Sequence, residues 1–183
     1  MSRVLDTITP EVARFIQSQP VFFVATAPLS DDGHVNCSPK GHDTFRVLGD
    51  REVAYLDLTG SGAETIAHVR DNGRITLMFC AFDGKPNIVR LYGRAQVIPS
   101  DHPDAAPWLA HFPTFLSARS IIAVSVHRVS TSCGHGVPVL GTAEDRTQLL
   151  DWAERKAEAG LRAYRRNRNA TSIDQLPAID NPA

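Results

Sequence analysis

Residues 21–40 read VFFVATAPLSDDGHVNCSPK and predict two strands joined by a turn. β-Branched and aromatic side chains dominate residues 21–26, a composition typical of a buried strand. Residues 30–33, SDDG, have the composition of a turn, and residues 34–38 extend again. Two strands on either side of a short turn form a β-hairpin, so we expect the fold to be built on an antiparallel sheet.

The rest of the chain adds further strands and four helices. The long strand 88–98 contains Gly93, which indicates a β-bulge or a close backbone approach. Six or seven strands joined mostly by short turns predict a mainly β fold of the α+β type, an antiparallel barrel with peripheral helices. The other strands are expected over residues 45–48, 53–58, 74–79 and 120–129, and the helices over 10–19, 63–72, 101–112 and 142–168.

The chain length favours one domain with a C-terminal appendage. We expect a barrel domain over residues 1–141, and a C-terminal helix and tail over residues 142–183 that pack on the barrel or extend from it. Gly160 is the expected weak point of the long helix, because glycine is a poor helix former. The tail from residue 171 is polar and contains prolines, so it is expected to be loose.

Composition excludes several classes of protein. A formal net charge of −1 gives no overall field that attracts nucleic acid or an anionic membrane. The three cysteines are far apart and form no CxxC pair, which argues against a disulfide framework and a zinc site. The sequence shows no apolar leader and no run long enough to span a bilayer. Unpaired thiols suit a reducing compartment, so we expect a cytoplasmic protein.

Two motifs indicate a site for an anion. The first is residues 36–41, NCSPKG, where Ser38 offers a hydroxyl, Lys40 offers a cation, and Pro39 fixes the turn. A point charge beside directed donors is what a phosphate group requires. The alternative is a solvated lysine in a β-turn, where lysines are usually exposed.

The second motif is residues 59–65, TGSGAET, between a strand and a helix. Gly60 and Gly62 allow a ligand to approach the backbone, and the helix N-terminus presents free N–H groups. The alternative is a capped helix with Ser61 as N-cap and Glu64 completing a capping box. Capping does not explain glycines on both sides of Ser61. The hydroxyl donors expected here belong to Thr59, Ser61 and Thr65.

From residue 21 to about residue 97 the chain resembles the FMN-binding split-barrel superfamily, which includes pyridoxamine 5′-phosphate oxidase. The quoted elements are FFVAT, VNCSPKG, VAYLDL, the Gly/Ser/Thr loop, DNGRITLMF and NIVRLYGRAQVI. The resemblance implies a split β-barrel that binds flavin mononucleotide (FMN). It also implies that Lys40, with Ser61 or Thr65, grips the FMN phosphate, and that two subunits form a homodimer around the flavin.

The activity that the resemblance implies is a flavin-dependent oxidoreductase acting on a small molecule. The chain lacks the Arg-x-His substrate motif of the pyridoxamine phosphate oxidases, so we do not expect that vitamin to be its substrate. Because the flavin carries the redox chemistry, no side chain is assigned an acid or base role. Two alternatives stay open: the same fold with the deazaflavin F420 or haem, and a flavin-binding protein without catalysis.

Two further features have competing interpretations. Arg90 alternates with apolar residues on the strand 88–98 and either reaches the flavin or faces water. Cys133 and His135 lie in a Gly/Pro-rich segment that either borders the ligand or is only a turn. The basic end of the last helix, residues 162–168, complements the helix dipole and lacks the aromatic platform of RNA-binding proteins.

Overall fold

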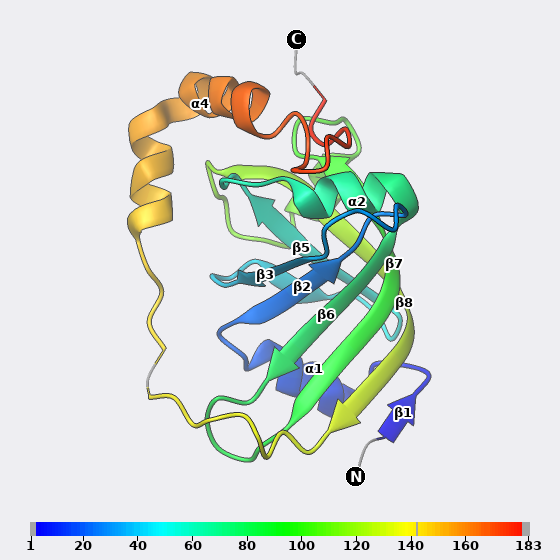
Figure 1. The fold of residues 1–183 in the computed structure, drawn as a ribbon. Helices are drawn as coiled ribbons and strands as arrows, with labels where there is room; N and C mark the ends of the chain where they lie inside the picture. The colour runs from blue at the N-terminus through cyan, green and yellow to red at the C-terminus, as the bar shows by residue number, and fades with distance from the viewer. Residues whose placement is uncertain (1–2, 142, 181–183) are drawn as a thin grey trace.

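The computed structural model describes residues 3–141 and 143–180, which form a curled antiparallel sheet with helices around it (Figure 1). In this part of the chain the sheet has eight strands in the order β3-β2-β6-β7-β8-β5-β4, and β1 pairs with β8. The expected antiparallel split barrel with peripheral helices and a long C-terminal helix is therefore confirmed. The elements are β1 (Arg3–Leu5), α1 (Pro10–Gln17), β2 (Phe22–Thr26), β3 (Asn36–Lys40), β4 (Phe45–Val47), β5 (Glu52–Leu58), α2 (Glu64–Asn72), β6 (Arg74–Cys80), β7 (Ile88–Pro99), α3 (Ala105–Leu109), β8 (Ala118–Ser132) and α4 (Gln148–Arg168).

The strands of the inner face form because alternate side chains meet in a core. Phe22 and Val24 of β2 are buried, and their pairing partners on β6 are Phe79 and Leu77, which are buried as well. Side chains on a strand alternate between the two faces, so the residues between them lie on the outer face. Each fully buried large apolar side chain contributes about 1.5–3 kcal/mol. Burial on the inner face of the sheet therefore stabilises the fold, and α1 packs against this face through Val12 and Ile16.

Gly93 makes the bulge that the sequence predicts. The pairing register between β7 and β8 shifts between Tyr92 and Gly93. A Cβ atom at position 93 would lie 2.6 Å from the carbonyl oxygen of Ser125, a distance that real side chains do not reach. Only glycine therefore allows β8 to approach β7 here.

The structure corrects four predictions about helices. α3 has only five residues, since Pro103 and Pro113 flank it. Residues 143–147, before α4, are not helical, and residue 142 lies outside the described residues. The break in α4 is at Ala157, which has a φ of 52°, while Gly160 continues the helix. The bend brings Trp152 and Tyr164 into edge-to-face contact at 5.0 Å. Ser61 does not cap α2, which begins at Glu64 without a side-chain cap.

The tail after α4 was expected to be loose, and this expectation is wrong. Ala178 is buried in the core, and its N–H donates to the carbonyl of Ala170. The side chains of Leu176 and Ile179 pack against the same core. Asp180 forms a two-bond ion pair with Arg70 of α2. A few apolar side chains and local hydrogen bonds thus fix residues 169–180 beside α2 (Figure 1).

A histidine–aspartate pair links this tail to the β2–β3 hairpin. Asp174 Oδ1 lies 2.7 Å from His34 Nδ1, and Oδ2 accepts a bond from the His34 backbone N–H. The hydrogen bond and the charge of Asp174 raise the pKa of His34, and the same contact lowers the pKa of Asp174. The protonated imidazole is therefore favoured. The link is strongest below the ordinary His pKa and is lost as pH rises through the raised one.

We expect nuclear magnetic resonance titration of the His34 ring to give a pKa above the ordinary value of about 6.5. In the variant Asp174→Asn the carboxylate is removed, so the His34 pKa should fall back toward that value. Asp180→Asn, at the far end of the tail, is the control and should leave the titration unchanged. A wild-type His34 that titrates as in Asp174→Asn would show that the pair does not form in solution.

Candidate cofactor site

The two predicted motifs lie close together on the inner side of the sheet. Ser38 and Lys40 lie on the half-buried face of β3, and Cys37 and Pro39 point to the exposed face, as strand alternation requires. Lys40 Nζ donates to Asp57 Oδ1 of β5 at 3.1 Å. The lysine is therefore held in place rather than mobile, while about a fifth of its side chain stays accessible.

Asp57 is shared by two cations. Its side chain is 1% exposed, and Oδ2 accepts a 2.6 Å bond from Nε of Arg119 at the start of β8. Burial would raise the pKa of Asp57, but the charges of Arg119 and Lys40 outweigh burial and lower it. With the carboxylate ionised, two positive charges face one negative charge. The cluster of Lys40, Asp57 and Arg119 thus carries one excess positive charge.

Arg119 extends this cluster to the loop before α2. Its Nη2 donates to the carbonyl of Gly62 at 2.7 Å. Its Nη1 is buried and has no hydrogen-bond partner among the described residues. A buried guanidinium N–H without an acceptor is costly, and buried polar groups are nearly always paired. An anionic oxygen at this loop would supply the missing acceptor, so the residues present fit a phosphate group.

The residues of the loop before α2 differ in whether the protein already binds them by hydrogen bonds. The Thr59 hydroxyl is buried, donates to the carbonyl of Ser117 at 2.8 Å and accepts from Arg165 Nε. Ser61 is exposed. A Cβ atom on Gly60 or Gly62 would meet no other atom closer than 3.6 Å. Packing therefore does not require these glycines, and the space beside them is open to a ligand.

Thr65 belongs to a polar chain deeper in the barrel. It accepts a bond from Asn36 Nδ2, which also donates to Thr26. The Thr26 hydroxyl lies 3.0 Å from Nδ1 of His68, and burial lowers the pKa of that histidine. These contacts fix α2 to the hairpin. The Thr65 hydroxyl is thus already bonded within the protein.

The structure does not bring Arg90 or Pro39 to this cluster. The pairing register places Pro39, Phe23, Met78 and Arg90 in one row across β3, β2, β6 and β7. That row lies on the outer face, opposite the inward-pointing Lys40. Arg90 instead donates to the hydroxyl of Ser132.

Sequence reasoning missed three residues that complete the site: Asp57, Arg119 and Arg165. Asp57 is the second-last residue of the apolar strand VAYLDL, and Arg119 is the second residue of the apolar strand ARSIIAV. Charged side chains inside buried strands are rare unless they are paired, so each was a signal for a partner. Arg165 lies on α4 and donates hydrogen bonds to the Thr59 hydroxyl and to the carbonyl of Ala118, and no local sequence pattern predicts these bonds.

Comparison with known proteins gives consistent matches. Residues 8–133 match the family model described as pyridoxamine 5′-phosphate oxidase. A curated relative from Aspergillus flavus, the pyridoxamine 5′-phosphate oxidase family protein ustO, is 39% identical over 191 residues, which cover 95% of this chain and 76% of the relative.

Solved structures match at the level of the fold. The H111A variant of HupZ from Group A Streptococcus has a TM-score of 0.53 at 23% identity, and the match covers 68% of this chain and 99% of that chain. A Lactobacillus delbrueckii protein that bears the pyridoxamine 5′-phosphate oxidase name has a TM-score of 0.53 at 20% identity, over 68% of this chain and 94% of its own. Among the helices of the described residues, none has the length and apolarity to cross a membrane.

Proposed function

Because this chain belongs to the pyridoxamine 5′-phosphate oxidase family, we propose that it binds FMN and acts as an oxidoreductase on a small molecule. The observation that carries the proposal is the cluster of Lys40, Asp57 and Arg119. It holds one excess positive charge and a buried Arg119 N–H without an acceptor among the described residues. A flavin phosphate supplies both the negative charge and the acceptor.

In this proposal each residue has a defined task. Lys40 and Arg119 bind the phosphate, and Asp57 orients both cations so that their donors are fixed before the ligand arrives. Ser61 and the backbone of Gly60 and Gly62 border the same space and offer further donors. The bound flavin supplies the electron transfer to and from the substrate. The chain therefore contributes binding and orientation, and no side chain is assigned a catalytic acid or base role.

The first test is the absorbance spectrum of the protein purified without added cofactor and repeated after dialysis against excess FMN. A flavin spectrum that survives gel filtration would support FMN binding. Reduction by NADH or NADPH followed by reoxidation would then support an oxidoreductase, whereas an inert flavin would favour a non-catalytic flavin-binding protein. Spectra of haem or of the deazaflavin F420 would replace FMN, and a protein that takes up none of these would overturn the proposal.

Lys40→Ala tests the phosphate assignment. We expect the dissociation constant for FMN to rise about tenfold or more, since a hydrogen bond to a charged group contributes about 1.5–3 kcal/mol. Stability should fall only modestly, because Asp57 keeps its bond to the Arg119 guanidinium. Fluorescence quenching of FMN measures the affinity.

Lys85→Ala is the matched control for this variant. Lys85 is an exposed turn lysine with no ion pair among the described residues, so its loss should leave the FMN affinity unchanged. Equal FMN affinity in Lys40→Ala and in the wild type would remove Lys40 from the site.

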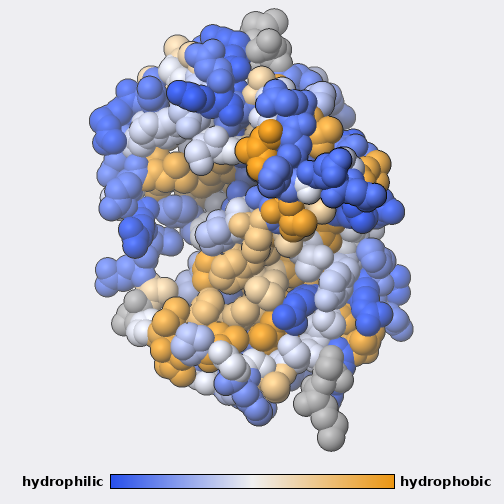
Figure 2. All heavy atoms as spheres, in the orientation of Figure 1, coloured by the Kyte–Doolittle hydropathy of each residue, from blue (hydrophilic) through white to orange (hydrophobic). Residues whose placement is uncertain are grey.

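We also propose that the protein is a cytoplasmic homodimer. Two features support self-association. Phe23 and Met78 are only half-buried on the outer face of the sheet, and Val139 and Leu140, in the segment between β8 and α4, are 77% and 52% exposed. Figure 2 shows apolar side chains gathered on this face, and an opening between it and that segment. Light scattering after gel filtration should give twice the chain mass, and a monomer at micromolar concentration would contradict the proposal.

The free state of the three cysteines supports the proposed cytoplasmic location, because unpaired thiols suit a reducing compartment.

A further inference from the structure

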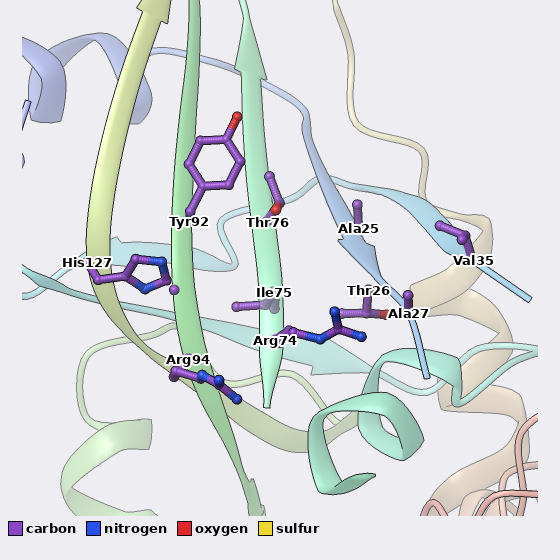
Figure 3. Close-up of a pocket in the computed structure, with 11 residues that line it drawn as sticks. Ala25, Thr26, Ala27, Val35, Arg74, Ile75, Thr76, Tyr92, Arg94 and His127 are labelled. Atoms are coloured by element: carbon purple, nitrogen blue, oxygen red, sulfur yellow. The ribbon is translucent and has the colours of Figure 1, made fainter. Parts of the chain in front are cut away.

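One cavity of the structure lies away from the Lys40 cluster. It has a volume of about 440 Å³ and lies on the outer face of the sheet, over the end of β2, the start of β6 and the middle of β7 and β8 (Figure 3). This volume is within the range of small-molecule sites, which is about 300–1,000 Å³. The side chains of Arg74, Tyr92, Arg94 and His127 line it, together with small and apolar residues that include Ala25, Ala27 and Ile75.

The cavity has an apolar floor and a cationic end. Ala25, Ala27 and the ring of Tyr92 form a surface that suits the flat or aliphatic body of a ligand. The side chains of Arg74 and Arg94 both lie at the end of the cavity nearest α2, and the guanidinium of Arg74 points toward Thr26 and Ala27 (Figure 3). A ligand that fits both parts has an apolar body and one anionic group.

The two arginines are held in place by neutral oxygens of Asn72, the last residue of α2, and of Pro28, and not by acidic side chains. Arg74 donates from Nε to Asn72 Oδ1 and from Nη2 to the carbonyl of Pro28, both at 3.1 Å. Arg94 donates from Nη1 to the carbonyl of Asn72. Among the described residues, no carboxylate lies within 4.0 Å of either guanidinium, whereas four other arginines each pair with one: Arg46, Arg70, Arg119 and Arg162.

A helix C-terminus attracts cations through its dipole, and this attraction explains why both arginines lie at the end of α2. The dipole does not explain why several of their N–H groups lack a hydrogen-bond acceptor. Nη1 of Arg74 and Nε and Nη2 of Arg94 have no bond to a described residue. Two fixed guanidiniums with spare donors are a suitable receptor for a carboxylate or a phosphate.

We propose that this cavity binds a small organic anion, with its apolar body on the sheet and its carboxylate or phosphate on Arg74 and Arg94. The site is separate from the proposed flavin site. The Lys40 cluster lies near the N-terminus of α2, and the two arginines lie at the C-terminus of the same helix. A helix of nine residues is roughly 13 Å long, at a rise of about 1.5 Å per residue. The inference does not depend on the proposed flavin function.

Titration of the full chain with phenyl phosphate, benzoate and inorganic phosphate tests the proposal, with amide chemical shifts as the readout. We expect phenyl phosphate or benzoate to shift the amides of Thr76, Gly93 and Arg94, and to bind at least ten times more tightly than inorganic phosphate. The stronger of the two organic anions identifies the preferred anionic group. Arg94→Gln and Arg74→Gln should each weaken that binding about tenfold.

Two controls make the outcome specific. Arg14→Gln removes an exposed arginine from the last turn of α1, so it changes a helix-terminal cation without touching the cavity, and it should leave binding unchanged. Lys40→Ala should also leave it unchanged, which separates this site from the flavin site. The proposal is overturned if no probe shifts these amides at 10 mM, or if Arg74→Gln and Arg94→Gln bind the organic anions as tightly as the wild type does.

Discussion

Asp57→Asn should lower the free energy of unfolding by roughly 3–5 kcal/mol, the range measured when one partner of a buried ion pair is removed. The reason is that the Arg119 guanidinium stays buried after its charged partner has been removed. Arg119 is 7% exposed, and its Nε loses the carboxylate that lies 2.6 Å away. Lys40 loses its partner at the same time. Asparagine has nearly the same shape as aspartate, so the change removes the charge without leaving a cavity.

Urea unfolding followed by circular dichroism measures this loss, and Asp43→Asn is the matched control. Asp43 also pairs with an arginine, Arg46, but its side chain is 61% exposed. Surface pairs contribute about 0–1 kcal/mol, so the control should change stability little. Similar losses in the two variants would contradict the argument from burial.

The pH dependence gives a second readout for Asp57. Its pKa is lowered in the folded protein, so its contribution is fully present above the unfolded-state pKa of about 3.9 and is lost as pH falls below that value. The stability difference between the wild type and Asp57→Asn should therefore be largest near neutral pH and should shrink in acid. A difference that stays constant down to pH 3 would show that the carboxylate charge is not the cause.

A double variant separates the fold from the binding site. Replacing buried ion pairs with apolar residues of similar volume is often neutral or stabilising. Asp57→Leu combined with Arg119→Met should therefore recover much of the stability that Asp57→Asn loses, but it should not bind FMN. A double variant that binds FMN like the wild type would show that the cluster is purely structural.

The sheet was largely predictable from the sequence because its signal is local. Alternating apolar residues mark an inner face, and each predicted strand overlaps an observed one. Gly93 predicts a bulge because glycine weakens the interior of a β-branched strand and is tolerated there mainly where the backbone bends or another strand comes close. The helices were less predictable at their ends. Residues 143–147 contain good helix formers, yet propensity is a weak prior where no apolar face packs against the barrel.

The site was predictable only in part, because its contacts join residues that are far apart in sequence. The motif around Lys40 was found from its composition, but the partner Asp57 lies 17 residues away and Arg119 lies 62 residues beyond Asp57. Strand register decides that these side chains meet, and register depends on the whole sheet. Ser61 shows the opposite error, since its spacing to Glu64 matches a capping box that the backbone does not form.

Ala178→Arg is expected to lower the free energy of unfolding by about 2–4 kcal/mol, since burying an unpaired charge is among the most destabilising substitutions. Ala178 is 1% exposed and lies in the core beside Leu176 and Ile179. An arginine does not fit this space, so the tail must detach and expose those side chains. Thr171→Arg adds the same charge at an exposed tail position and should change stability little.

The same variant should also weaken FMN binding, because the tail supports the loop before α2. Asn169 donates to the carbonyl of Gly60, and the N–H of Ile173 donates to Glu64 at the first turn of α2. Detachment releases both contacts, and faster amide hydrogen exchange in α2 and residues 59–63 would report it. If Ala178→Arg unfolds early but keeps wild-type FMN affinity below its unfolding transition, the tail stabilises the fold alone. If exchange and affinity change together, the C-terminal segment is part of the cofactor site, acting through the loop before α2 and not through the Lys40 cluster itself.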